Sequence, residues 1–141
     1  MVGSEFYRSN FNSSEAFVTD LSLDRDSKPN CWVVVAVSFK STVHLFWVDE
    51  EVTEAKSVLS KSSQYVMSYF SSNAIDWTSI TVASTEGFSK YCLLRGGKLI
   101  VIYFRVKDHM TMEAVYLTAT VKSRTCSITT VEKFAVDIDG E

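Results

Sequence analysis

The chain has 141 residues, of which 46% are hydrophobic and 22% are charged, and its net charge is −3. This balance is typical of a globular protein and excludes an intrinsically disordered one. The small negative charge gives no sign of a protein that binds the phosphate backbone of nucleic acids. A chain of this length suits one domain, which we expect over residues 7–141.

The ends and the apolar runs carry no membrane or secretion signal. Met1–Phe6 resembles vector-encoded sequence, because two common restriction sites in tandem encode its Gly-Ser-Glu-Phe. The longest apolar runs, Trp32–Val37 and Leu99–Phe104, are far shorter than the roughly 20 residues of a membrane helix. The three cysteines are odd in number and lie in strand-like segments, which predicts reduced thiols and an intracellular protein, cytoplasmic or nuclear. They are Cys31, Cys92 and Cys126.

Strand patterns fill the first third of the chain. Residues 17–23 alternate between apolar and polar side chains, which predicts a half-buried strand. The sequence DRDSKPN at residues 24–30 predicts a turn. Residues 31–39 are apolar on both faces and therefore predict a central strand, and residues 43–48 predict a third.

The pattern becomes helical after the third strand. Val52, Ala55 and Leu59 recur at helical spacing, and the pattern continues to Phe70. Asp49 is expected to cap the first turn, with Glu50 and Glu51 placed where the helix dipole favours negative charge. The sequence SKSS at residues 60–63 has weak helix propensity, which predicts a break near Ser62.

Strand patterns return in the second half, at residues 79–84, 88–95, 98–106 and 113–121. A last strand is predicted where Phe134, Val136 and Ile138 share one face. Gly96-Gly97 predicts a tight hairpin turn, and KDHMTM at residues 107–112 predicts a second. Because helices interrupt the strands only once, we expect a mainly β (α+β) fold. It would be an antiparallel β-sandwich or half-open barrel of about seven strands, with a helical insertion after strand 3.

No residue pattern predicts catalysis, a metal site or a cofactor. His44 and the acidic run that begins at Asp49 could supply metal ligands, but consecutive helical residues diverge, and a helix start explains the run better. His109 has no nucleophile motif to accompany it, so a solvent-facing turn residue is favoured. We therefore predict that the protein is not an enzyme.

Two features leave a binding role open. Met110 and Met112 lie at a predicted hairpin tip, and methionine is common at adaptable protein-binding surfaces. The alternative is that both side chains fold back onto the sandwich. Aromatic residues could line a ligand cavity, although they more often fill a core. They are Trp32, Phe46, Trp47, Tyr69, Phe70 and Trp77.

Three stretches resemble one family of scaffold head domains. The first is FVTDLSLDRDSKPNCWVVVAVSFKSTVHLFWVDEEVTEA, the second is SSQYVMSYFSS, and the third is GKLIVIYFRVKDHMTMEAVYLTATV. In their order of strands, helical insertion and long hairpin they are similar to the heads of the DNA ligase IV partner scaffold, of XLF and PAXX, and of the centriolar cartwheel proteins. The chain departs from that family at FAVDIDGE, which alternates like a strand where those heads pass into a helix.

The resemblance implies a non-catalytic scaffold whose head associates with other heads or with partner proteins. In that family the long hairpin and the nearby helical region make these contacts. The matching positions here are Lys107, Asp108, His109, Met110 and Met112, with Lys56 and Lys61 on the helices.

Two functions remain as hypotheses from the sequence. The first is a protein-interaction or scaffold domain that mediates self- or partner association, including a homodimer, in DNA end-joining or a centriole-like assembly. The alternative is a small-molecule or lipid-binding β-barrel-like domain with a helix over its cavity. Neither hypothesis requires a nucleic acid, a membrane or a cofactor.

Overall fold

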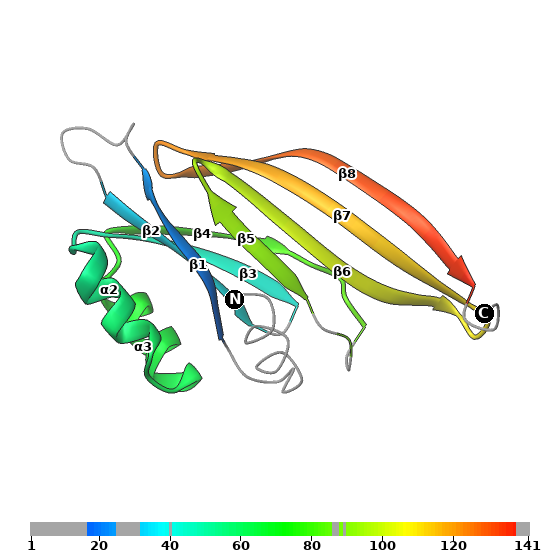
Figure 1. Cartoon of the computed structure of the whole chain (residues 1–141), viewed down its shortest axis with the longest axis horizontal. Helices are drawn as coiled ribbons and strands as arrows, with labels where there is room; N and C mark the ends of the chain where they lie inside the picture. Colours follow the sequence, from blue (N-terminus) through cyan, green and yellow to red (C-terminus); the bar gives the residue numbers. More distant parts are fainter. Residues whose placement is uncertain (1–16, 25–31, 40, 86–87, 89, 138–141) are drawn as a thin grey trace.

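The computed structural model describes residues 17–24, 32–39, 41–85, 88 and 90–137 (Figure 1). The predictions for Met1–Phe6, the turn after Asp24, Cys31 and Ile138 lie outside these residues. Within them, no helix is long and apolar enough to cross a membrane.

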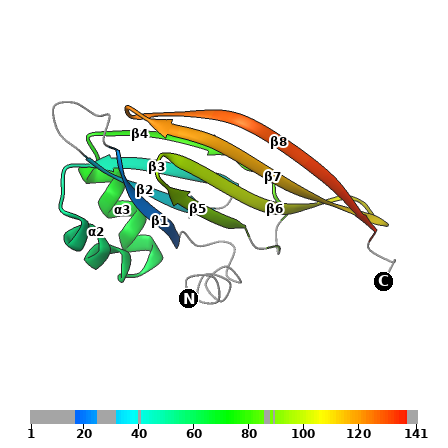
Figure 2. The same ribbon diagram turned by 45° about the horizontal axis from the view of Figure 1, so that its top comes forward.

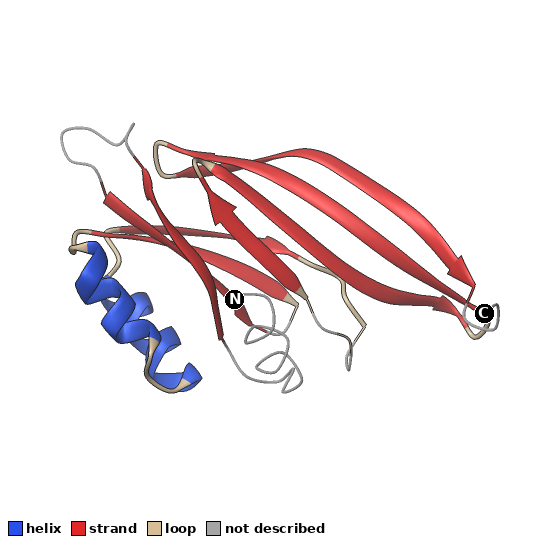
Figure 3. Cartoon of the chain, viewed as in Figure 1, coloured by secondary structure: helices blue, strands red, loops and turns tan. Residues whose placement is uncertain are grey.

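Two antiparallel sheets of four strands pack face to face, and two helices lie on one of them (Figure 3). The sheets have the strand orders β1-β2-β3-β4 and β5-β6-β7-β8. The first contains β1 (Phe17–Asp24), β2 (Trp32–Phe39), β3 (Thr42–Val48) and β4 (Asp76–Thr81). The second contains β5 (Tyr91–Arg95), β6 (Lys98–Asp108), β7 (Thr111–Lys122) and β8 (Thr125–Asp137). This arrangement confirms the predicted antiparallel sandwich with a helical insertion after the third strand.

The differences from prediction are in strand number and strand limits. The described part of the chain has eight strands where about seven were expected. β8 begins at Thr125, well before the predicted start near Phe134, and β4 begins at Asp76. Gly96 and Gly97 form the predicted β5–β6 turn with φ values of 58° and 79°, which glycine adopts without strain.

The helical insertion is two helices, α2 (Val52–Leu59) and α3 (Ser63–Asn73). The predicted break is confirmed, because the Ser62 hydroxyl accepts a hydrogen bond from the Tyr65 N–H at 3.3 Å and caps α3. The prediction that Asp49 caps the first helix is wrong. Glu51 is the N-cap of α2 and makes no side-chain cap, while the preceding Glu50 carboxylate accepts a hydrogen bond from the Tyr69 hydroxyl of α3.

Two apolar clusters stabilise these layers. The inner cluster lies between the sheets and includes Trp47, Leu99 and Val101, all fully buried. The outer cluster joins the far side of the first sheet to both helices, and Phe46 stacks on Phe70 of α3 there. β2 sends alternate side chains into the two clusters, which explains why its sequence is apolar on both faces.

Candidate interaction surface

The strands of the second sheet differ greatly in length. β5 pairs with β6 only as far as Ile102, while β6, β7 and β8 continue together beyond that point. The continuation projects past the rest of the sandwich in both views (Figures 1 and 2). We call it the arm and define it as residues 103–108, 111–115 and 133–137.

The outer face of the arm is apolar. The register places Val106, Met112 and Val136 in one row across the three strands. The next row contains Phe104, Ala114 and Phe134. Phe134 is 55% exposed, and Val106 and Val136 are 40% and 39% exposed. These two rows therefore form a contiguous apolar surface, and nothing in the described part of the chain packs on it.

The inner face of the arm is charged toward its end. Arg105 lies opposite Glu113 in the register, and their side chains form an ion pair at 3.5 Å. Lys133 lies opposite Val115 in the register, and Val115 belongs to the inner cluster, so Lys133 is also on the inner face. The arm is therefore amphipathic, with its charges on the side that continues the sandwich interior.

The predicted hairpin-tip residues come together at the end of the arm. Residues 107–110 are all exposed, and Met110 is 43% exposed. Asp108 stabilises the turn, because its Oδ1 accepts a hydrogen bond from the Met110 N–H at 2.9 Å. Met112 is half-buried on the outer face, between Val106 and Val136. The two methionines thus differ: one is at the tip and the other is part of the apolar surface.

The helical lysines lie elsewhere. Lys56 is in α2 and Lys61 follows it, and both are exposed. Both helices pack on the first sheet, at the opposite end of the molecule from the arm (Figure 1). The structure therefore does not bring Lys56 and Lys61 together with the hairpin tip.

Asp24 is a polar residue that the sequence analysis missed. Its side chain is buried, and Oδ2 accepts hydrogen bonds from Trp47 Nε1 at 2.8 Å and the Arg124 N–H at 3.0 Å. Oδ1 accepts a third from the Ser123 N–H at 3.2 Å. Ser123 and Arg124 have positive φ values of 53° and 61°, so this carboxylate stabilises a β7–β8 turn that their side chains disfavour. Asp24 lies about 100 residues before that turn in sequence, and no local pattern reveals the contact.

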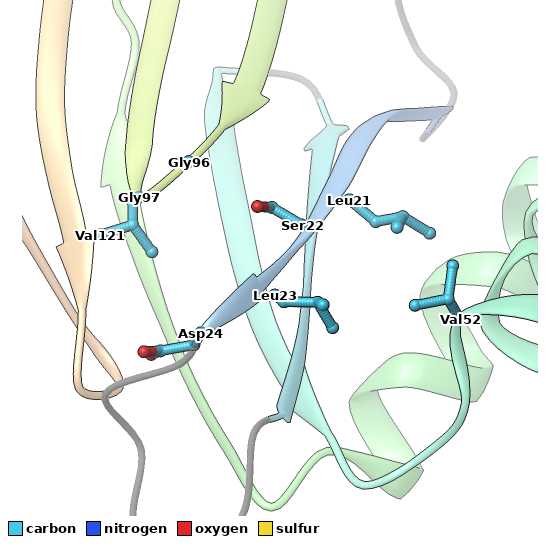
Figure 4. A pocket seen from close by; sticks show the side chains of 8 residues that line it. All are labelled: Leu21, Ser22, Leu23, Asp24, Val52, Gly96, Gly97 and Val121. Atoms are coloured by element: carbon cyan, nitrogen blue, oxygen red, sulfur yellow. The ribbon is translucent and has the colours of Figure 1, made fainter.

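A groove lies beside Asp24, between β1, the Gly96-Gly97 turn and the start of α2 (Figure 4). Its volume is about 660 Å³, and most of its lining side chains are apolar. They include Leu21, Leu23, Val52 and Val121. The groove touches both clusters, because Leu21 and Leu23 pack with the outer cluster and Val121 belongs to the inner one.

Burial shifts the pKa of several titratable groups in the described part of the chain. Burial raises the pKa of the Cys92 thiol to about 12, so this thiol remains protonated at neutral pH. Burial also lowers the pKa of the neighbouring Lys90 ammonium. Burial lowers the pKa of His44, whose ring contacts those of Phe46 and Trp77. Among the described residues, no group of three or more His, Cys, Asp or Glu side chains could hold a metal ion.

The predicted aromatic set divides between core and surface. Phe46, Trp47 and Phe70 are buried, as expected for core residues. Trp77 is 58% exposed on the edge strand β4. The aromatic residues therefore do not line one common cavity.

Comparison with known proteins found no matching family model, no matching curated protein and no matching solved structure.

Proposed function

We propose that the chain is a non-catalytic protein-interaction domain that docks through the outer face of the arm. The observation that carries this proposal is the exposed apolar surface formed by Val106, Phe134 and Val136. Covering such side chains removes apolar area from water, and fully burying a Phe or Val contributes about 1.5–3 kcal/mol. A contiguous exposed apolar patch of this kind commonly marks an interaction site.

The resemblance to scaffold heads supports the same proposal at a finer level. In those heads the long hairpin makes head-to-head contacts, and β6–β7 is the corresponding hairpin here. The proposal therefore includes a scaffold role in DNA end-joining or a centriole-like assembly. β8 occupies the segment where those heads pass into a helix, so the arm of this chain has a third strand that the resemblance does not account for.

A photo-crosslinking amino acid placed at single positions tests the docking surface. We would introduce it at Phe134 and at Val106, with Trp77 as the control, because Trp77 is at least as exposed as either residue but lies on the first sheet. The proposal expects both arm positions to cross-link to the same partner protein, identified by mass spectrometry. This cross-link should be lost when the same chain also carries Val136→Glu. Equal adducts from all three positions, or none from the arm, would contradict it.

The alternative of a small-molecule or lipid binder has one observation in its favour, which is the groove beside Asp24. Its volume of about 660 Å³ is within the range of ligand pockets. Native mass spectrometry of the purified protein would detect a bound apolar ligand. A Leu23→Trp variant should displace that ligand while leaving the arm adducts unchanged.

A further inference from the structure

β8 is an edge strand with an open side. β7 pairs with it from Thr125 to Asp137, and β8 ends the strand order of its sheet. Within the described residues, no strand pairs with its other edge. The outward-facing N–H and C=O groups of such an edge can pair with another strand.

The opposite edge of the arm, which belongs to β6, forms hydrogen bonds with Thr85, so it differs from the open edge of β8. Beyond Tyr91, the first residue of β5, Thr85 lies beside β6 instead. Its Oγ1 accepts a hydrogen bond from the Val106 N–H at 2.7 Å, and its N–H donates to the Phe104 carbonyl at 3.1 Å. Natural proteins also protect edges with proline, lysine or a bulge. β8 has no proline, one lysine, and its one bulge near Thr129, before the arm.

Exposed apolar side chains occur on both faces of β8. Ile128 and Val131 pair with inward-facing Ala119 and Leu117, so they lie on the inner face, and they are 50% and 47% exposed. Phe134 and Val136 lie on the outer face. A partner stacked on one face would leave two of these four side chains exposed. A strand added along Val131–Asp137 contacts Val131, Phe134 and Val136 and leaves one of the four, Ile128, without contact. The edge of β8 therefore explains the pattern better than either face.

We propose that a second copy of this chain pairs antiparallel with β8, with Phe134 opposite Phe134 of the other copy. This inference rests on the proposed function and names the partner for the same surface. A two-fold axis perpendicular to a sheet places one residue opposite itself and keeps the outer faces of both copies on one side. Pairing would give a continuous sheet of eight strands with one extended apolar face.

Charge disfavours two neighbouring registers, and strand regularity favours a centre near Phe134. Centring the pair on Glu132 or Lys133 would place like charges directly opposite each other, which destabilises strand pairs. Centring it on Phe134 places Lys133 opposite Ala135 and Glu132 opposite Val136 of the second copy. Phe134 also lies next to the centre of Thr130–Asp137, the stretch that follows the bulge and pairs regularly with β7.

The size of the paired edge indicates reversible association. A seven-residue strand is about 23 Å long, and sheet layers are about 10 Å apart. The contact is therefore smaller than the roughly 800 Å² per partner of a standard stable interface. We expect a monomer–dimer equilibrium that shifts with protein concentration.

Charge-reversal variants at the self-pairing position give the first test. Sedimentation velocity of the full chain over about a hundredfold concentration range should show a dimer. Phe134→Lys and Phe134→Glu should each be monomeric, because position 134 of each copy would face the same charge on the other copy. A mixture of the two variants should associate again, because the facing charges are then opposite. Far-UV circular dichroism checks that both variants fold, and Ser127→Glu is the control on the same strand outside the arm. A monomeric wild type, or a dimer that both variants retain, would overturn the inference.

Cysteine cross-linking tests the register without introducing charge. Opposite residues in an antiparallel pair have Cα atoms about 4.5–5.5 Å apart, which suits a disulfide. Phe134→Cys should cross-link to its own copy, whereas Glu132→Cys should not, because its two copies would lie about 13 Å apart. Glu132→Cys mixed with Val136→Cys should cross-link. Cross-linking of Met112→Cys in place of Phe134→Cys would indicate stacked faces and overturn the inference.

The two proposals fail in different ways. A monomer whose arm positions still give a specific adduct with another protein would overturn the β8 pairing and leave the docking surface intact. Loss of arm adducts of every kind would overturn both.

Discussion

The outer faces of the two sheets are built from similar apolar strands but are covered differently. On the first sheet, α2 and α3 cover the outer face and bury Phe46, Val35 and Val37 completely or nearly so. On the second, the described residues provide no such layer, and the apolar rows of the arm remain exposed. Apolar alternation thus shows that a strand face needs cover, but it does not show whether the chain itself provides that cover.

The largest expected effect compares a phenylalanine that covers the first sheet with one on the exposed face of the arm. Phe70 of α3 is fully buried against the first sheet, so Phe70→Ala should lower the free energy of unfolding by about 3–5 kcal/mol. Phe134→Ala should cost less than about 1 kcal/mol, because more than half of its side chain is already in water. Urea titration at low protein concentration, followed by circular dichroism, measures both. Equal costs would mean that the arm is covered in solution.

Asp24→Ala tests whether the two sheets form one cooperative unit. The carboxylate connects Trp47 of the first sheet to the β7–β8 turn of the second, and its removal leaves three N–H donors without this acceptor. We expect a loss of about 3 kcal/mol. Asp24→Asn retains one acceptor oxygen and should lose less. All three tryptophans lie in the first sheet, so tryptophan fluorescence reports on that sheet. If it and circular dichroism give different unfolding midpoints in Asp24→Ala, the sheets separate when this contact is lost.

The Gly96-Gly97 turn offers a matched pair on the second sheet. Gly96→Ala should cost about 1 kcal/mol, because its φ of 58° is left-handed but a Cβ there meets no atom within 4 Å. Gly97→Ala should cost more, because its Cβ would lie 3.3 Å from the Val121 carbonyl oxygen. Thermal unfolding of both variants measures the difference. The opposite order would show that backbone conformation outweighs this close approach.

The smallest expected effect is a pH dependence of the unfolding free energy that arises from His44 on the first sheet. Burial lowers the pKa of His44 in the folded protein below its ordinary value of 6.5, so the unfolded chain binds more protons as the pH falls through that value. Stability should therefore decrease from pH 7 downward through the range below 6.5. His44→Phe removes the titration and retains an aromatic ring. Its unfolding free energy should vary less with pH in this window than that of the wild type, and an unchanged slope would assign the effect to other groups.

The sequence predicted those strands whose burial leaves a pattern. β2, β6 and β7 alternate or are apolar throughout because they face one or both clusters. The first half of β8 was missed because its side chains are exposed. Between Thr125 and Val136, every residue except Cys126 is exposed, so burial imposes no periodic pattern on the sequence. β4 was started too late for a related reason, since Trp77 is an exposed aromatic on an edge strand.

The sequence named part of the surface that we propose. Of the two methionines at the predicted hairpin tip, Met112 belongs to the arm and Met110 lies in the turn at its end. The row through Val106 and Val136 could not be predicted, because it depends on the register of three strands and on where β5 ends. Asp24 was also beyond sequence reasoning, because its partners at Ser123 and Arg124 are 99 and 100 residues away.

That long separation has a consequence for the order of events during synthesis. The Asp24 carboxylate leaves the ribosome with β1, but the turn it stabilises emerges only after almost all the other strands. Until then the Trp47 indole N–H has an acceptor, whereas the two backbone donors of the turn do not yet exist. The nascent chain therefore cannot complete this connection between its sheets until the β7–β8 hairpin has been made, and we expect the last strand to dock onto an N-terminal half that is already folded.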